Sequence, residues 1–193
     1  MGKDKLRRFA ENETFGNIVQ PTREEAVAGL HLKGKWREDH FKNDKPIVLE
    51  LGCGHGDYTV GLARLHPEKN FIGVDIKGAR MWKGAKTALN EGLDNVAFLR
   101  IEIELIEKCF AGNEISEIWI TFPDPQIKFK RAKHRLVHPI FLERYRSLLT
   151  SGGQIHLKSD SEFLHGYLSG ILHGSDWTIH EAYYDIHHQL KNE

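Results

Sequence analysis

From Pro46 onward, the chain alternates apolar runs of strand length with longer segments in which apolar residues recur at helical spacing. We predict strands over residues 47–51, 70–74, 96–101, 115–121, 154–158 and 178–185. We predict helices over residues 57–65, 77–90, 141–149 and 161–172, with Gly152 and Gly153 ending the third of them. Strands and helices that alternate in this way indicate an α/β fold, built on a doubly wound, mostly parallel sheet with helices on both faces.

The length of 193 residues suits one domain, and 40% hydrophobic with 28% charged residues is ordinary for a globular protein. We interpret residues 1–193 as a single domain, with residues 1–45 as a polar N-terminal extension and residues 46–193 as a Rossmann-like core. In the extension, Thr22 and Glu25 have the spacing of a capping box, which predicts a short helix. The two cysteines make no disulfide framework and no apolar run is long enough to span a membrane, so we expect a cytoplasmic protein.

A glycine-rich turn follows the first predicted strand, in the sequence Val48-Leu-Glu-Leu-Gly-Cys-Gly-His-Gly56. Glycine lets the backbone turn sharply and approach a ligand closely. Glu50 lies just inside the strand end, and Asp75 ends the next strand, where a carboxylate commonly accepts hydrogen bonds from ribose hydroxyls. A nicotinamide dehydrogenase normally needs GxGxxG before a pyrophosphate, and an acid beside the turn would repel phosphate. S-adenosylmethionine carries an amino group and a sulfonium but no phosphate, so spacing and charge favour it; a purely structural turn is the alternative.

A second motif, Thr121-Phe-Pro-Asp-Pro125, follows the fourth predicted strand. Its two prolines hold Asp124 in a stiff, extended turn. Residues 126–146 then contain seven Lys or Arg against one acid, Glu143. A basic run at a strand end, where ligands gather, suits a nucleic acid; a solvated surface is the alternative.

The ELGCGHG turn and the acidic end of the second strand resemble class I methyltransferases that use S-adenosylmethionine. The segment Phe122-Pro-Asp-Pro125 with its basic tail resembles the bacterial tRNA (guanine-N7-)-methyltransferase family, as do Lys5–Asn12 and His156–Asp160. The resemblance runs over nearly the whole chain. It implies transfer of a methyl group from S-adenosylmethionine to N7 of a guanine in tRNA, that of the variable loop.

The resemblance also implies roles for individual residues. The cofactor-binding set comprises Glu50, Gly52, Gly54, Gly56, Asp75, Glu102 and Asp124. The substrate-binding set comprises Lys128 and Asp160, to which the basic tail adds Lys130, Arg131, Lys133 and Arg135. Asp124 also matches the residue to which the family assigns a catalytic role. Because guanine N7 has a lone pair and no proton, we interpret Asp124 as an acceptor that orients the guanine rather than as a general base.

The chain departs from the family pattern in two places. Gln126, Ile127 and Phe129 replace tryptophan, proline and lysine, although Lys128 is kept. A T-x-Y-E-type motif and the seventh, antiparallel strand of a class I fold are missing from the sequence. We expect no metal, and either a monomer or a homodimer. Two alternatives stay open: another S-adenosylmethionine-dependent methyltransferase, and a non-catalytic tRNA-binding module on the same fold.

Overall fold

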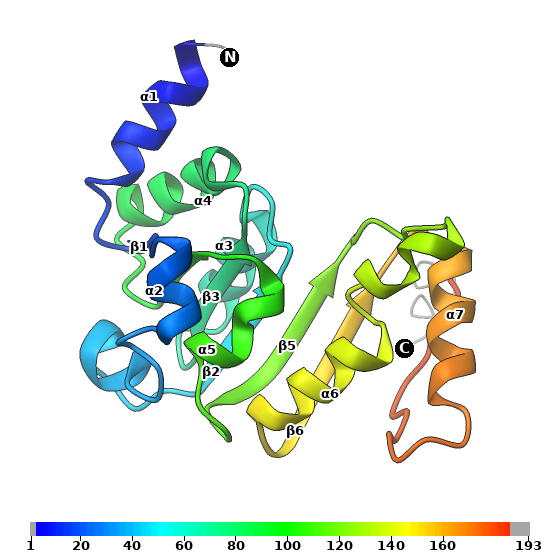
Figure 1. Ribbon diagram of the computed structural model, residues 1–193. Coiled ribbons are helices and arrows are strands. Elements are labelled where there is room, and N and C mark those ends of the chain that lie inside the picture. The colour runs from blue at the N-terminus through cyan, green and yellow to red at the C-terminus, as the bar shows by residue number, and fades with distance from the viewer. Residues whose placement is uncertain (1–2, 186–193) are drawn as a thin grey trace.

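A six-stranded sheet forms the centre of the molecule in the computed structural model, which describes residues 3–185 (Figure 1). The strands are β1 (Ile18–Val19), β2 (Ile47–Leu51), β3 (Asn70–Asp75), β4 (Val96–Arg100), β5 (Ile115–Thr121) and β6 (Leu149–Lys158). They lie in the order β1-β4-β3-β2-β5-β6, and every neighbouring pair is parallel. The order reverses between β2 and β5, and the carboxyl ends of strands at such a switch point are where open α/β sheets bind ligands.

Helices cover both faces of this sheet, as the sequence predicts. The α-helices are α1 (Lys3–Asn12), α2 (Arg23–Ala28), α3 (Asp57–Leu65), α4 (Gly78–Asn90), α5 (Ile106–Cys109), α6 (Pro139–Leu148) and α7 (Glu162–Leu172). Val60 of α3 and Met81 of α4 pack with Phe98 in one apolar cluster. Ile106 of α5 and Tyr145 of α6 belong to a second cluster. The doubly wound parallel fold is therefore confirmed.

The sixth strand predicted over residues 178–185 is wrong, because that segment forms neither a helix nor a strand. Its alternation rests on few apolar residues, and one of them, Ile179, is exposed. Such a segment buries too little apolar surface to offset the entropy of ordering it against the sheet. The sixth strand of the sheet is instead β1, which lies at the edge opposite β6. Ile18 of β1 pairs with Phe98 of β4.

Gly152 and Gly153 lie inside β6 and do not end the preceding helix. α6 ends at Leu148 and β6 begins at the next residue. Ile115 pairs with Leu149 and Glu117 with Gln154, so residues 150–153 bulge out of the strand. Gly152 has a φ of 77° in this bulge, a conformation that glycine adopts without strain.

The first 45 residues hold more regular structure than the sequence indicates. The capping box is confirmed, since Thr22 Oγ1 accepts from the Glu25 N–H at 3.2 Å and Glu25 accepts from the Thr22 N–H at 2.7 Å. The start of the chain, which the sequence predicts to be irregular, forms α1 instead. A π-helix, η1, spans Trp36–Phe41. Trp36 is fully buried in the same cluster as α6, so this segment contributes to the core.

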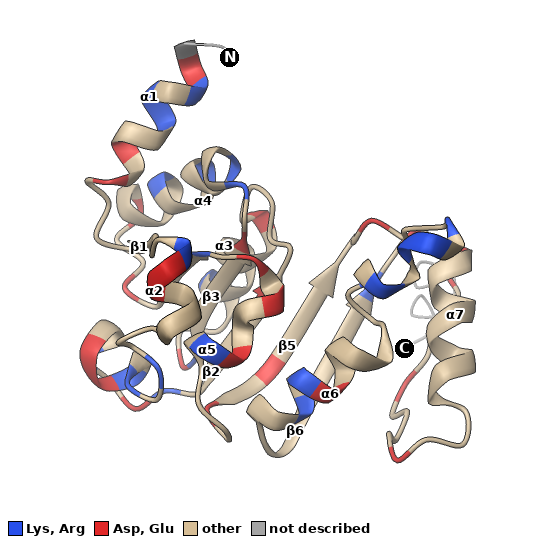
Figure 2. Ribbon diagram, in the orientation of Figure 1, with Lys and Arg blue, Asp and Glu red and all other residues tan. Residues whose placement is uncertain are grey.

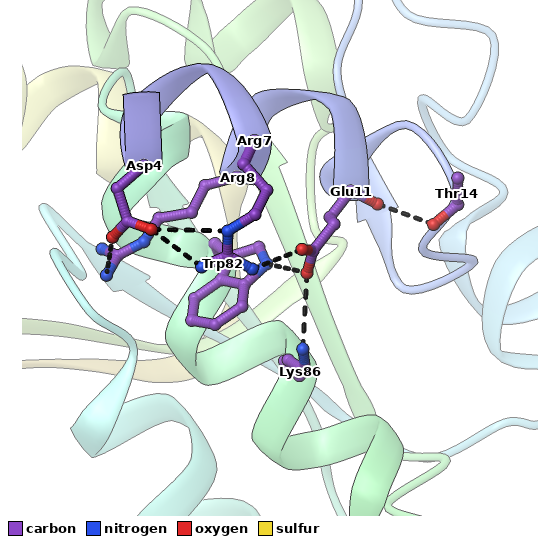
Figure 3. Close-up of polar contacts among 7 residues, drawn as sticks. All are labelled: Asp4, Arg7, Arg8, Glu11, Thr14, Trp82 and Lys86. Atoms are coloured by element: carbon purple, nitrogen blue, oxygen red, sulfur yellow. Dashed lines mark hydrogen bonds and ion pairs between the residues drawn. The ribbon is translucent and has the colours of Figure 1, made fainter. Parts of the chain in front are cut away.

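α1 docks on α4 through a polar and aromatic contact around Trp82 (Figure 3). The Trp82 indole N–H donates to Glu11 at 2.8 Å. Arg7, Arg8 and Lys86 lie 5.2, 4.9 and 4.7 Å from the Trp82 ring centroid, within the range of cation–π attraction. α1 is thus held by tertiary contacts that its own polar sequence does not reveal.

Candidate active site

The glycine turn connects the carboxyl end of β2 to the start of α3, and its backbone requires glycine. Gly54 has a φ of 55° and Gly56 a φ of 76°. A Cβ on Gly56 would lie 2.5 Å from Cε1 of Phe98, whereas a Cβ on Gly54 would meet no heavy atom closer than 4.0 Å. Gly56 therefore permits close packing on β4, and Gly54 leaves open space at the strand ends.

Asp75 lies beside this open space at the end of β3. Its two carboxylate oxygens accept hydrogen bonds from the N–H groups of Gly54, at 3.0 Å, and Lys77, at 2.8 Å. Each oxygen keeps a further lone pair for another donor. The open turn and the fixed carboxylate beside it leave hydrogen-bond acceptors free for a ligand at this edge of the sheet.

Glu50 is placed differently from the expectation for a cofactor-binding residue. Its side chain is only 4% exposed and is bonded within the protein. One carboxylate oxygen accepts from the N–H of Thr59 at 2.8 Å and from the Thr59 hydroxyl, and the other accepts from the Thr121 hydroxyl at 2.6 Å. Burial raises the pKa of Glu50, and these hydrogen bonds oppose the increase. Glu50 therefore ties the start of α3 to the end of β5.

Glu102 follows β4 and lines a cavity of about 180 Å³ at the ends of β3 and β4. The cavity is also lined by Pro21, Arg23, Ile76, Ile101 and Leu105. Arg23 of α2 reaches Glu102 at 2.7 Å, so an ion pair lies at the rim of the cavity. The sequence did not indicate Arg23, because it is 79 residues from Glu102 along the chain.

Asp124 is exposed in a turn just beyond β5, on a backbone with two unusual residues. Phe122 and Gln126 both have a φ of 46°, a backbone angle that residues other than glycine seldom adopt. Asp124 Oδ1 accepts from the Gln126 N–H at 3.0 Å, which fixes the side chain within the turn. Positive φ at non-glycine residues is a strain that concentrates at functional sites.

The basic tail forms a short 3₁₀-helix, η3 (Phe129–His134), seen as blue ribbon beyond the end of β5 in Figure 2. Lys130, Arg131 and Lys133 are exposed on it, and Lys128 is exposed directly before it. Phe129 lies among them with its side chain 95% exposed.

Arg135 differs from the other cations of the tail, because it is only 5% exposed. Its guanidinium donates to the carbonyl oxygens of Pro125 and Gln126, at 3.1 to 3.3 Å. It also lies 4.8 and 4.3 Å from the ring centroids of Phe163 and Tyr167 on α7. These contacts commit Arg135 to holding the Asp124 turn on α7, which is not the substrate-binding position predicted from its charge.

Another predicted residue, Asp160, is exposed after the end of β6, the strand next to β5. It therefore lies at the same edge of the sheet as the Asp124 turn. Within residues 3–185, no group of three or more His, Cys, Asp or Glu is arranged to hold a metal ion. None of the described helices is long and apolar enough to cross a membrane.

The comparisons with known proteins show the family and the fold of the chain. The family model Methyltransf_4, described as "Putative methyltransferase", matches residues 44–179. The crystal structure of the antibiotic-resistance methyltransferase Kmr superposes with a TM-score of 0.50 at 22% identity, covering 65% of this chain and 68% of that one, which shows the fold alone. Parallel sheet, glycine turn and acidic strand end together define a class I methyltransferase that takes S-adenosylmethionine as methyl donor.

Two of the curated relatives that the chain matches are both named tRNA (guanine-N(7)-)-methyltransferase. The tRNA (guanine-N(7)-)-methyltransferase of Christiangramia forsetii is 65% identical over 192 residues, covering 99% of this chain and 84% of the relative. That of Bacteroides fragilis is 49% identical over 189 residues, covering 97% and 74%. The chain belongs to the tRNA (guanine-N(7)-)-methyltransferase family.

Proposed function

We propose that this protein methylates N7 of a guanine in tRNA, the variable-loop guanine, with S-adenosylmethionine as the donor. The observation that carries the proposal is the meeting of two motifs at one switch point: the glycine turn after β2 and the Asp124 turn after the neighbouring β5. S-adenosylmethionine supplies an activated methyl group. In this proposal, Asp75 and Glu102 at the ends of β3 and β4 hold its adenosine.

The reaction needs no general base. The N7 lone pair forms the new bond to the methyl carbon, and the electron pair of the broken carbon–sulfur bond stays on sulfur. Asp124 accepts hydrogen bonds from N1–H and the N2 amino group and so orients the guanine ring. Positioning of this kind contributes roughly 7 to 11 kcal/mol in favourable cases.

The exposed cations supply the affinity for tRNA. Lys128 and the η3 cations bind backbone phosphates and fix the register of the RNA, while Asp160 contacts the substrate from just beyond the end of β6. Arg135 acts indirectly, by holding the turn. We place the enzyme in the cytoplasm, as a monomer or a homodimer.

The test is labelled methyl transfer to unmodified tRNA, with the modified nucleoside mapped. We expect 7-methylguanosine from the native chain and none from Asp124→Asn. S-adenosylhomocysteine binding, measured by calorimetry, should persist in that variant. Asp44→Asn is the matched control, since Asp44 is exposed before the amino end of β2. A chain that binds tRNA but not S-adenosylhomocysteine would be the non-catalytic module, and full activity in Asp124→Asn would remove Asp124 from its assigned role.

A further inference from the structure

Two aromatic side chains face each other across the switch point between β2 and β5. Tyr58 lies in the first turn of α3, and Phe122 directly follows β5. Their ring centroids are 6.1 Å apart and the ring planes are inclined by 59°. The sequence assigned neither ring a role, although Phe122 begins the Phe122-Pro-Asp-Pro125 motif, and the two residues are 64 positions apart along the chain.

The placement of the two rings follows from the bonds of Glu50. Glu50 binds Thr59 through one carboxylate oxygen and Thr121 through the other. Thr59 and Thr121 are the immediate chain neighbours of Tyr58 and Phe122. One buried carboxylate therefore sets the distance between the two elements that carry the rings.

Phe122 is held in an unfavourable position for an apolar residue. Its φ is 46° and its side chain is 51% exposed, although its N–H is fixed to the Lys158 carbonyl at 2.8 Å. A strained backbone with a half-exposed ring gains little from core packing. A ring presented to solvent two residues before Asp124 is instead available to a ligand.

The pair of rings already attracts a positive charge. The Lys158 ammonium lies 5.3 Å from the Tyr58 centroid and 5.9 Å from that of Phe122. Both distances are within the range of cation–π attraction. The long, flexible lysine side chain can move aside when another cation enters.

We propose that Tyr58 and Phe122 form the stacking site for the target guanine and favour its ring as it becomes cationic. This inference rests on the proposed function. Methylation at N7 moves the positive charge from the sulfonium to the guanine ring, so rings that attract cations bind the transition state more tightly than the neutral substrate. Phe122 lies two residues before Asp124, so a guanine oriented by Asp124 comes close to its ring.

The variants that test this are Phe122→Leu and Tyr58→Leu, with Phe122→Tyr as the conservative replacement. Leu65→Ala is the control, because Leu65 is an exposed apolar residue at the far end of α3. Single-turnover methyl transfer should fall roughly 10- to 100-fold in Phe122→Leu, the range expected for one lost base-stacking contact, and recover in Phe122→Tyr. S-adenosylhomocysteine affinity and the melting temperature should stay at the native values.

A second measurement separates stacking from a structural role. The native chain should bind 7-methylguanosine more tightly than guanosine at mildly acidic pH, where the methylated ring is cationic, and Phe122→Leu should lose this preference. Native transfer rates in both leucine variants, or an equal loss of S-adenosylhomocysteine binding, would overturn the inference. If the native chain fails to form 7-methylguanosine in tRNA, the proposed function fails first, whichever variant is used.

Discussion

The buried carboxylate of Glu50 offers the sharpest test of how the site is held. Glu50→Gln keeps the shape of the side chain and all three contacts. The amide oxygen can accept from Thr59, and the amide NH₂ can donate to the Thr121 hydroxyl, which also accepts. Glu50→Ala removes every contact and leaves the Thr59 N–H and two hydroxyls without their acceptor.

The two variants should therefore differ strongly in stability. Each buried donor that loses its partner costs about 1 to 3 kcal/mol, which is partly offset because a buried charge is removed. We expect Glu50→Ala to lower the free energy of unfolding by about 3 to 5 kcal/mol. For a chain of this size that corresponds to a melting temperature lower by ~10 °C.

The difference in stability between Glu50→Gln and the native chain should depend on pH. Burial raises the pKa of Glu50, so the folded state binds this proton more tightly than the unfolded state does. The native chain then loses stability relative to Glu50→Gln as the pH rises from the ordinary carboxyl range through the raised pKa. At low pH, where the carboxyl is protonated, the two should be nearly equal.

Urea unfolding from acid to neutral pH, with calorimetry of S-adenosylhomocysteine, measures both effects. Glu24→Gln, an exposed change on α2, is the control. A Glu50→Gln variant that is as unstable as Glu50→Ala would refute the conclusion that hydrogen bonds of residue 50 tie the start of α3 to the end of β5. A stable Glu50→Gln that no longer binds S-adenosylhomocysteine would show that the charge contacts the cofactor, as the sequence resemblance implies.

The remaining predictions concern the basic tail and the glycine turn. Three exposed cations, Lys130, Arg131 and Lys133, can be replaced jointly by alanine. The slope of log tRNA affinity against log salt concentration should then become shallower by about 2 to 3. An unchanged slope would make them ordinary surface charges. Arg135→Ala should lower the free energy of unfolding by about 2 to 4 kcal/mol and reduce methyl transfer while leaving the salt slope unchanged; a reduced slope would return Arg135 to the RNA contacts. Gly56→Ala should cost about 2 to 5 kcal/mol in thermal unfolding, because its Cβ would meet Phe98, and Gly54→Ala, which lacks that contact, should cost about 1 to 2 kcal/mol; equal losses would contradict the packing role.

The sequence predicts the centre of the sheet well, for a physical reason. β2 and β5 have the predicted bounds, and α3 does too, because each combines a strong apolar pattern with a clear boundary. α1 could not be predicted in this way. Its sequence is polar, and its contact with Trp82 joins segments more than 70 residues apart.

The candidate site was predictable in its motifs and less so in its roles. The sequence identifies which residues are charged, but burial and partners decide what a charge does. Glu50 and Arg135 were expected to meet ligands, and both are bonded inside the protein. The Tyr58–Phe122 pair depends on a contact between the start of α3 and the end of β5 that no local pattern contains.

The edge position of β1 has a consequence for how the chain folds during synthesis. Ile18 pairs with Phe98, so β1 must wait until about eighty further residues have left the ribosome before its partner exists. β2 and β3, in contrast, can pair soon after they emerge, since Ile47 meets Asn70. Loop closure over the longer distance is the slower step. β1 is made before its partner strand and is therefore among the last strands to be fixed, and until then Ile18 and Val19 remain open to chaperones and proteases.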